Sequence, residues 1–139
     1  GSAVQLAKCC RPIPGDPIIG VVLKGQGLMV HTRDCRSIGK SRHERDNNWV
    51  NVEWEQSSGS LFEVGIRIVT ENRRGVLARM ASVIAEADSD IQNVSMEDDH
   101  GLYTTLQFSL QVTGRVHLAR IMRSLRRIPE LMRITRIKE

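Results

Sequence analysis

Three cysteines and one histidine in the first 35 residues are the side chains of this sequence best suited to chemistry. Cys9 and Cys10 are adjacent, and His31 and Cys35 lie four residues apart further along the chain. Neighbouring cysteines rarely pair with each other, because the ring that such a disulfide closes is strained. Thiolates and an imidazole are, however, the ligands that tetrahedral zinc prefers. The set predicts a structural zinc site without an open position for water. The alternative is that the cysteines are small core residues beside a capping histidine.

A turn, a hairpin and a short helix are the elements that would hold these four side chains together. The run Pro12-Ile13-Pro14-Gly15 follows the adjacent cysteines and indicates a turn. Apolar runs at 18–23 and 28–31, joined by Lys24-Gly25-Gln26-Gly27, are typical of a β-hairpin. Thr32 is a suitable helix N-cap, which would place Cys35 in the first turn, where the helix dipole favours a thiolate. These elements predict a small α/β module.

A small polar run at residues 56–60, QSSGS, separates this module from a second one. We therefore expect two domains, at residues 3–56 and 61–139. In the second domain, apolar residues alternate from Phe62 to Ile68 and again from Leu102 to Val112, as they do in half-buried strands. Shorter strands are predicted at 91–97 and 131–137.

Two amphipathic helices are predicted between these strands. Their apolar stripes have helical spacing and consist of Leu77, Met80, Ala81 and Ile84 in the first helix and Leu118, Ile121, Met122, Leu125 and Ile128 in the second. Thr113 is expected to cap the second helix, and Pro129 to end it. The order βαββαβ predicts a four-stranded antiparallel sheet with both helices on one face, the ferredoxin-like arrangement. The fold class is therefore α+β.

Composition and pattern exclude several classes of protein. The 139 residues contain no run of about 18 apolar residues, so no membrane-spanning helix is predicted. Because no secretory leader pattern precedes the first motif, we expect a cytoplasmic protein with reduced thiols. His43 to Asp46 is interpreted as an exposed helix end, and His100 and His117 have no evident partners for acid–base work. The chain itself is predicted not to be an enzyme, and no catalytic cofactor is expected.

The late part of the chain is strongly basic. Residues 114–138 carry eight lysines and arginines against one glutamate, a net charge of +7. Arg120, Arg123 and Arg127 fall on the polar side of the second predicted helix, where they could contact RNA or an acidic partner. A solvated helix face is the other interpretation. Two Trp, two Phe and one Tyr in the whole chain offer little for stacking on bases.

Residues 70–77, TENRRGVL, resemble the loop that opens the first helix of ACT domains, which share the βαββαβ topology. That resemblance implies an amino-acid site at the free N–H groups of the helix start, shared across a homodimer. Its residues would be Asn72, Gly75, Val76 and Leu77 from one copy and Ile91 and Asn93 from the other. Where ACT domains often carry a glycine before their second strand, this sequence has Asp88 and Asp90, whose carboxylates would repel that of a ligand. The alternative is that Gly75 is a plain turn glycine.

The two modules in this order closely resemble the C-terminal end of the RelA/SpoT alarmone enzymes, and their sequence resembles the SpoT branch most. The resemblance covers nearly the whole chain and rests on AKCCRPIPGDPIIG at 7–20, KGQGLMVH at 24–31, Cys35, VEW at 52–54 and HLARIMR at 117–123. It implies a zinc-finger-like, or conserved-cysteine, domain followed by an ACT domain. Cys9, Cys10, His31 and Cys35 would be the family's cysteine and histidine positions.

The same resemblance implies a regulatory function in the stringent response. In that family this end receives starvation signals, contacts the ribosome or partner proteins, and shifts distant catalytic domains between making and hydrolysing (p)ppGpp. The full-length parent would be a (p)ppGpp 3'-pyrophosphohydrolase and GTP pyrophosphokinase. Two alternatives stay open: a ribosomal-RNA-binding module that uses the basic helix, and a stand-alone amino-acid sensor.

Overall fold

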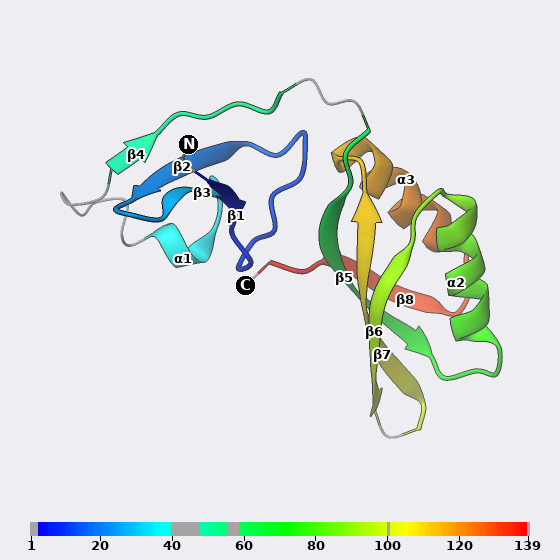
Figure 1. Cartoon of the computed structure of the whole chain (residues 1–139). Coiled ribbons are helices and arrows are strands. Elements are labelled where there is room, and N and C mark those ends of the chain that lie inside the picture. The colour runs from blue at the N-terminus through cyan, green and yellow to red at the C-terminus, as the bar shows by residue number, and fades with distance from the viewer. Residues whose placement is uncertain (1–2, 40–47, 56–58, 100, 139) are drawn as a thin grey trace.

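The computed structural model describes residues 3–39, 48–55, 59–99 and 101–138. Over these ranges the chain forms two modules, each built on a four-stranded sheet (Figure 1). We call residues 3–55 the first module and residues 59–138 the second. The predicted helix end at 43–46 and most of the predicted linker lie outside the described residues.

The first module is a small mixed sheet with one helical turn. Its elements are β1 (Val4–Leu6), β2 (Ile18–Leu23), β3 (Gly27–Thr32), α1 (Arg36–Gly39) and β4 (Asn48–Val50), with strand order β1-β3-β2-β4. β2 and β3 form the expected hairpin, and β1 runs parallel to β3. Strands β1 and β4 were not predicted, because three residues are too few to show a period. Helix α1 begins after Cys35, so the expectation that Thr32 caps a helix containing Cys35 is wrong.

The second module confirms the expected ferredoxin-like βαββαβ fold. Its elements are β5 (Phe62–Glu71), α2 (Val76–Glu86), β6 (Ile91–Asp99), β7 (Tyr103–Val112), α3 (Arg115–Leu125) and β8 (Leu131–Arg136). The sheet has the order β6-β7-β5-β8 and every pair in it is antiparallel. In Figure 1 the two helices lie to the right of this sheet and the first module lies to its left.

The main hydrophobic core lies between this sheet and its two helices. Alternating residues of β5 and β7 supply one wall and the helical stripes supply the other, as the spacing predicts: Val64, Ile66, Ile68, Leu106, Phe108, Leu110, Met80, Ile84, Ile121 and Leu125 are all buried. One member of this core comes from the first module. Ile13 is 0% exposed and packs among these side chains, although it precedes β5 by almost 50 residues.

The start of α3 differs from the prediction. Gly114, not Thr113, holds the N-cap position, and no side chain caps the helix. The N–H of Thr113 instead donates to Nδ1 of His117 at 3.0 Å, and Nε2 of His117 lies 2.7 Å from the carbonyl oxygen of Ala87. Because Nδ1 accepts, Nε2 carries the proton and donates to that carbonyl. His117 is thus a buried link between α3 and the end of α2, not an unpartnered residue of a basic helix.

None of the helices in the described ranges is both long enough and apolar enough to cross a membrane.

Candidate functional site

The four predicted zinc ligands meet in space. Their ligand atoms, three Sγ atoms and one ring nitrogen, all lie within 4.8 Å of one another. Sγ of Cys9 is 3.4 Å from Sγ of Cys35 and 3.5 Å from Nδ1 of His31, and Sγ of Cys10 is 3.9 Å from the same nitrogen. Zinc bonds of about 2.0–2.3 Å in a tetrahedron require ligand atoms about 3.3–3.8 Å apart. The separations of 3.4–3.9 Å are close to these dimensions, so the cluster is of a size that can hold a metal ion after a small contraction.

Short backbone turns present the two ligand pairs. The N–H of Arg11 donates to the carbonyl of Ala7 at 2.9 Å, which closes a turn around the adjacent cysteines. The N–H of Ala7 in turn donates to the carbonyl of Val30 at 2.9 Å, so this turn is attached to β3 beside His31. Cys35 follows β3 in a second turn, closed by its own N–H on the carbonyl of Thr32 at 3.1 Å. The sheet, and not a helix, thus sets the spacing of the site.

Burial and hydrogen bonding shift the pKa values of these groups in different directions. Burial raises the pKa of the Cys10 thiol to about 12, while the N–H of Thr32 donates to its Sγ at 3.3 Å and favours the thiolate. Burial also raises the pKa of Cys35, but hydrogen bonds from Cys9 and from the Ser37 backbone outweigh it, and the net shift is downward. Burial lowers the pKa of His31, which keeps its imidazole neutral and its lone pair available. N–H donors to sulfur ligands are a common support of such sites.

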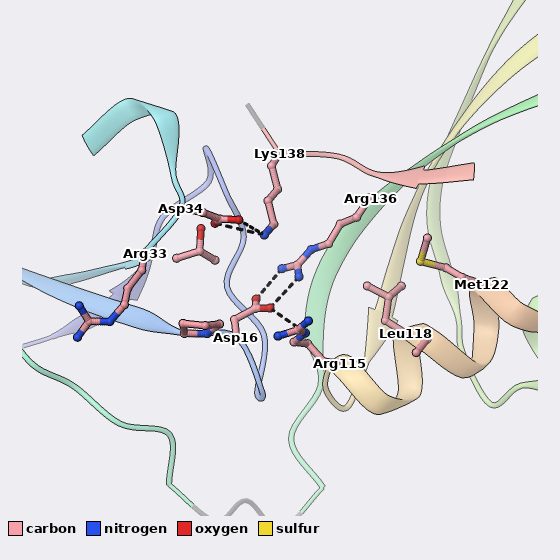
Figure 2. Close-up of a pocket in the computed structure, with 11 residues that line it drawn as sticks. Asp16, Arg33, Asp34, Arg115, Leu118, Met122, Arg136 and Lys138 are labelled. Atoms are coloured by element: carbon pink, nitrogen blue, oxygen red, sulfur yellow. Dashed lines mark hydrogen bonds and ion pairs between the residues drawn. The ribbon is translucent and has the colours of Figure 1, made fainter. Parts of the chain in front are cut away.

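The turn that follows the adjacent cysteines also joins the two modules. The side chain of Asp16 is 3% exposed, and its carboxylate accepts hydrogen bonds from both Nη atoms of Arg136, at 2.8 and 2.7 Å. Figure 2 shows this pair. Arg115 approaches the same carboxylate at 3.7 Å, and Lys138 lies 3.0 Å from a carboxylate oxygen of Asp34. These pairs border a pocket of about 500 Å³ between the modules, with Leu118 and Met122 of α3 on its far wall.

Further contacts strengthen this junction. The indole N–H of Trp54 donates to the carbonyl of Asp16 at 3.0 Å, and its ring meets that of Phe62 edge to face at 5.5 Å. Arg11 forms an ion pair with Glu63 of β5. The two modules are therefore held together by burial, ion pairs and aromatic packing at once.

The residues implied for an amino-acid site are divided between the two ends of the second sheet. Asn72 is held by the β6–β7 turn: its N–H donates to the carbonyl of Leu102 at 2.9 Å, and its side chain donates to that of Gly101 at 3.1 Å. Gly75 has a φ of 83°, Val76 is buried, and Leu77 is 36% exposed. An open pocket of about 690 Å³ lies on this loop, lined by Glu71, Asn72, Arg73, Arg74, Gly101, Leu102 and Tyr103.

Ile91 and Asn93 lie at the other end of β7. They are in register with Leu110 and Ser109, whereas Glu71, next to Asn72, pairs with Tyr103. Six strand residues at about 3.3 Å each separate the two groups by roughly 20 Å. One chain therefore does not bring them together, so a shared site would need a second copy.

The three arginines proposed for RNA contact have different surroundings. Arg120 donates to the carbonyl of Ala87 at 3.0 Å and to the carboxylate of Asp88 at 3.2 Å, so it ties α3 to the end of α2. Arg123 and Arg127 are exposed. Arg127 borders a groove of about 450 Å³ between the two helices, together with Arg79 and Arg120.

Sequence reasoning missed the junction between the modules. Ile13, Asp16 and Arg136 were not singled out as functional, because residues 120 positions apart leave no local pattern. The one available signal was Ile13 itself, a large apolar side chain between two prolines in a predicted turn.

Comparison with known proteins places both modules. Residues 1–55 match the family model described as the RelA/SpoT RIS domain, and residues 58–136 match the ACT domain. The bifunctional (p)ppGpp synthase/hydrolase SpoT of Escherichia coli (strain K12) is 37% identical over 98% of this chain and 19% of its own length. The GTP pyrophosphokinase of Streptomyces coelicolor is 28% identical over 96% of this chain and 16% of its own length. The chain thus spans about a fifth of the curated relatives it matches.

Among solved structures, the crystal structure of the ACT domain from the GTP pyrophosphokinase of Chlorobium tepidum aligns with a TM-score of 0.50. The alignment has 24% sequence identity and covers 56% of this chain and 100% of that one. It supports the fold of the second module alone.

Proposed function

Because this chain belongs to the ACT domain family and carries the RIS domain of RelA/SpoT proteins ahead of it, we propose that it is the regulatory region of a SpoT-like enzyme. The parent would both synthesise and hydrolyse (p)ppGpp in the cytoplasm, and this region would receive starvation signals and shift the balance between the two reactions. The observation that supports this proposal is the match of two consecutive domains over nearly the whole chain. We assign the domains to residues 3–56 and 61–139.

The regulatory proposal can be tested in the full-length parent enzyme. Replacing Asp16, Arg136 or Cys35 in this region, far from the catalytic domains, should change the ratio of (p)ppGpp synthesis to hydrolysis measured by nucleotide chromatography. Arg133→Gln is the matched control, because Arg133 is an exposed residue of the strand that carries Arg136. Equal ratios in all four proteins would contradict a regulatory role for this region.

For Cys9, Cys10, His31 and Cys35 we propose a structural zinc site. Bound there, the ion would supply a cross-link between the N-terminal turn and the end of β3, in addition to the hydrogen bonds that Ala7 and Thr32 already make between them. The chain's own contribution is a set of four preformed ligand positions and an N–H donor to one sulfur. Elemental analysis of the purified chain tests this: one zinc per chain is expected, and a metal content near zero after growth with zinc would refute it.

An RNA-binding function is a second candidate, and the arginine-lined groove between α2 and α3 favours it. Phosphate contacts would weaken with salt, so the salt dependence of ribosomal RNA binding is the informative measurement. Replacing Arg123 and Arg127 by glutamate should reduce both the affinity and the salt slope. Arg67→Glu together with Arg133→Glu, an equal charge change at exposed residues of β5 and β8, should not. Equal effects of both changes would exclude a specific contact by α3.

An amino-acid site shared by two copies is a third candidate. Asn72, Gly75, Val76 and Leu77 of one copy would face Ile91 and Asn93 of the other in a homodimer. Calorimetry with a panel of amino acids, together with light scattering, tests both parts. A monomer that releases no heat with any amino acid would refute this site.

A further inference from the structure

The six residues after the adjacent cysteines, Arg11 to Asp16, belong structurally to the second module. We call them the connecting segment. Ile13 is enclosed in the core of that module. The carbonyl of Pro14 accepts the N–H of Arg115 at 2.8 Å, at the start of α3. A Cβ at Gly114 would lie 2.9 Å from the same carbonyl oxygen, so only glycine permits this approach. The segment that begins next to two proposed ligands is therefore anchored in the other module.

The side chain of Arg136, in β8, binds both ends of the connecting segment. Its Nη2 donates both to the Asp16 carboxylate at 2.7 Å and to the carbonyl of Arg11 at 3.0 Å. The carboxylate also accepts the N–H of Ile13 at 2.9 Å, so it organises the inside of the turn. Arg11 has a φ of 44°, in the left-handed region that non-glycine residues seldom adopt. Arg136 thus binds the carbonyl of the strained residue directly after Cys10.

The second ligand pair is tied to the same C-terminal stretch. Lys138, two residues after Arg136, lies 3.0 Å from the carboxylate of Asp34, which immediately precedes Cys35 (Figure 2). One short stretch of the second module therefore contacts the neighbours of both ligand pairs, Cys9 with Cys10 and His31 with Cys35.

We propose that Asp16 and Arg136 are positioning residues for the cysteine site, so that the second module sets the metal affinity of the first. This inference rests on the proposed zinc site. Without the guanidinium, the buried carboxylate of Asp16 keeps the N–H of Ile13 at 2.9 Å and the approach of Arg115 at 3.7 Å but loses its two short charged contacts, and the carbonyl of Arg11 loses the donor Nη2 of Arg136. The turn that holds two sulfurs at ligand spacing then relaxes. Coupling between two sites is reciprocal, so zinc binding also stabilises the contact between the modules.

The test compares zinc affinity in whole-chain variants by competition with a chromophoric chelator. Arg136→Gln should weaken zinc binding by about 10- to 100-fold, the range found when groups that support metal ligands are removed. Asp16→Asn should weaken it similarly, and Arg136→Lys should restore part of the loss. Arg133→Gln, on the same strand and exposed, should bind zinc as the parent sequence does.

Amide hydrogen exchange supplies a readout that does not depend on affinity. The N–H of Arg115 exchanges only when the contact with Pro14 opens, so adding zinc should slow exchange in peptides that cover the start of α3. In Arg136→Gln, zinc should slow it less. Should Arg136→Gln not fold, Lys138→Gln removes the tie at Asp34 and allows the same comparison, with a smaller loss of affinity expected.

The outcomes separate the two proposals. Zinc bound equally by the Arg136→Gln, Lys138→Gln and Arg133→Gln variants would overturn the coupling and leave the zinc site intact. A parent chain that binds no zinc would overturn the zinc site itself, and this inference with it. Weaker binding by Arg136→Gln, joined to a loss of zinc-dependent protection at Arg115, would support the coupling.

Discussion

Replacing Ile13 by alanine should destabilise the second module, although Ile13 belongs to the first by sequence. The side chain is 0% exposed and packs in the core between the second sheet and its helices. Truncating a buried isoleucine to alanine costs about 2–5 kcal/mol, of which the larger values occur where the surroundings cannot collapse into the space. Here Pro14 and Asp16 fix the connecting segment on α3 and β8, so collapse is restricted. We therefore expect a loss of about 4 kcal/mol in the free energy of unfolding.

Urea unfolding followed by far-UV circular dichroism measures this loss, and amide hydrogen exchange locates it. Amides of β5 and β7 should lose protection along with those of the first module. Leu102→Ala is the matched control, because Leu102 is 71% exposed and its truncation should change the free energy by less than about 0.5 kcal/mol. A loss below about 1 kcal/mol for Ile13→Ala, or a loss of protection confined to β2 and β3, would refute the argument that Ile13 is part of the second core.

Three further predictions concern pH, metal and a buried histidine. The Ser109 hydroxyl holds the pKa of Glu63 below its usual value of 4.5, so Glu63 stabilises the fold fully above that pH and loses this effect as the pH falls through its lowered pKa. Glu63→Gln should therefore flatten the pH dependence of urea unfolding below pH 4.5. For the proposed zinc site, EDTA should lower the melting temperature of the unsubstituted chain but not that of Cys10→Ser. Because burial raises the pKa of the Cys10 thiol to about 12 and metal binding displaces its proton, the affinity for zinc should increase with pH. His117→Ala leaves the N–H of Thr113 without its acceptor and should lower the free energy of unfolding by about 2–3 kcal/mol in the urea assay. The control Val116→Ala, at an 87% exposed neighbour, should lower it by less than about 0.5 kcal/mol. Equal effects of the two changes would refute a structural role for the histidine.

The second module was predictable because its elements are long enough for their periods to be visible. The alternation from Phe62 to Ile68 and the stripe from Leu118 to Leu125 specified which faces are buried, and the order of the elements then left the ferredoxin-like sheet as the arrangement that covers them. The helix starts were harder to predict. Thr113 has a capping side chain, yet the close approach of Pro14 requires glycine at the next position, and this tertiary contact decided the cap.

The cysteine cluster was predictable from residue type, because few other arrangements make use of adjacent cysteines and a histidine four residues before a third. The local structure around Cys35, which is a turn and not the predicted helix, was not predictable from residue type. The local preference of Thr32 for a helix cap was outweighed by its place in β3, where it pairs with Ile18. The junction between the modules had no local signal, since ion pairs such as that of Asp16 with Arg136 depend on the three-dimensional fold of both modules.

The distance along the chain between Asp16 and Arg136 has a consequence for synthesis on the ribosome. The strands and thiols of the first module are made early, but the arginine that neutralises Asp16 follows 120 residues later. At about 5–20 residues per second this interval lasts roughly 6–24 s. During it, the carboxylate of Asp16 stays without the guanidinium that accompanies it into the folded protein, and Ile13 waits for the core residues of β5, β7, α2 and α3 that enclose it.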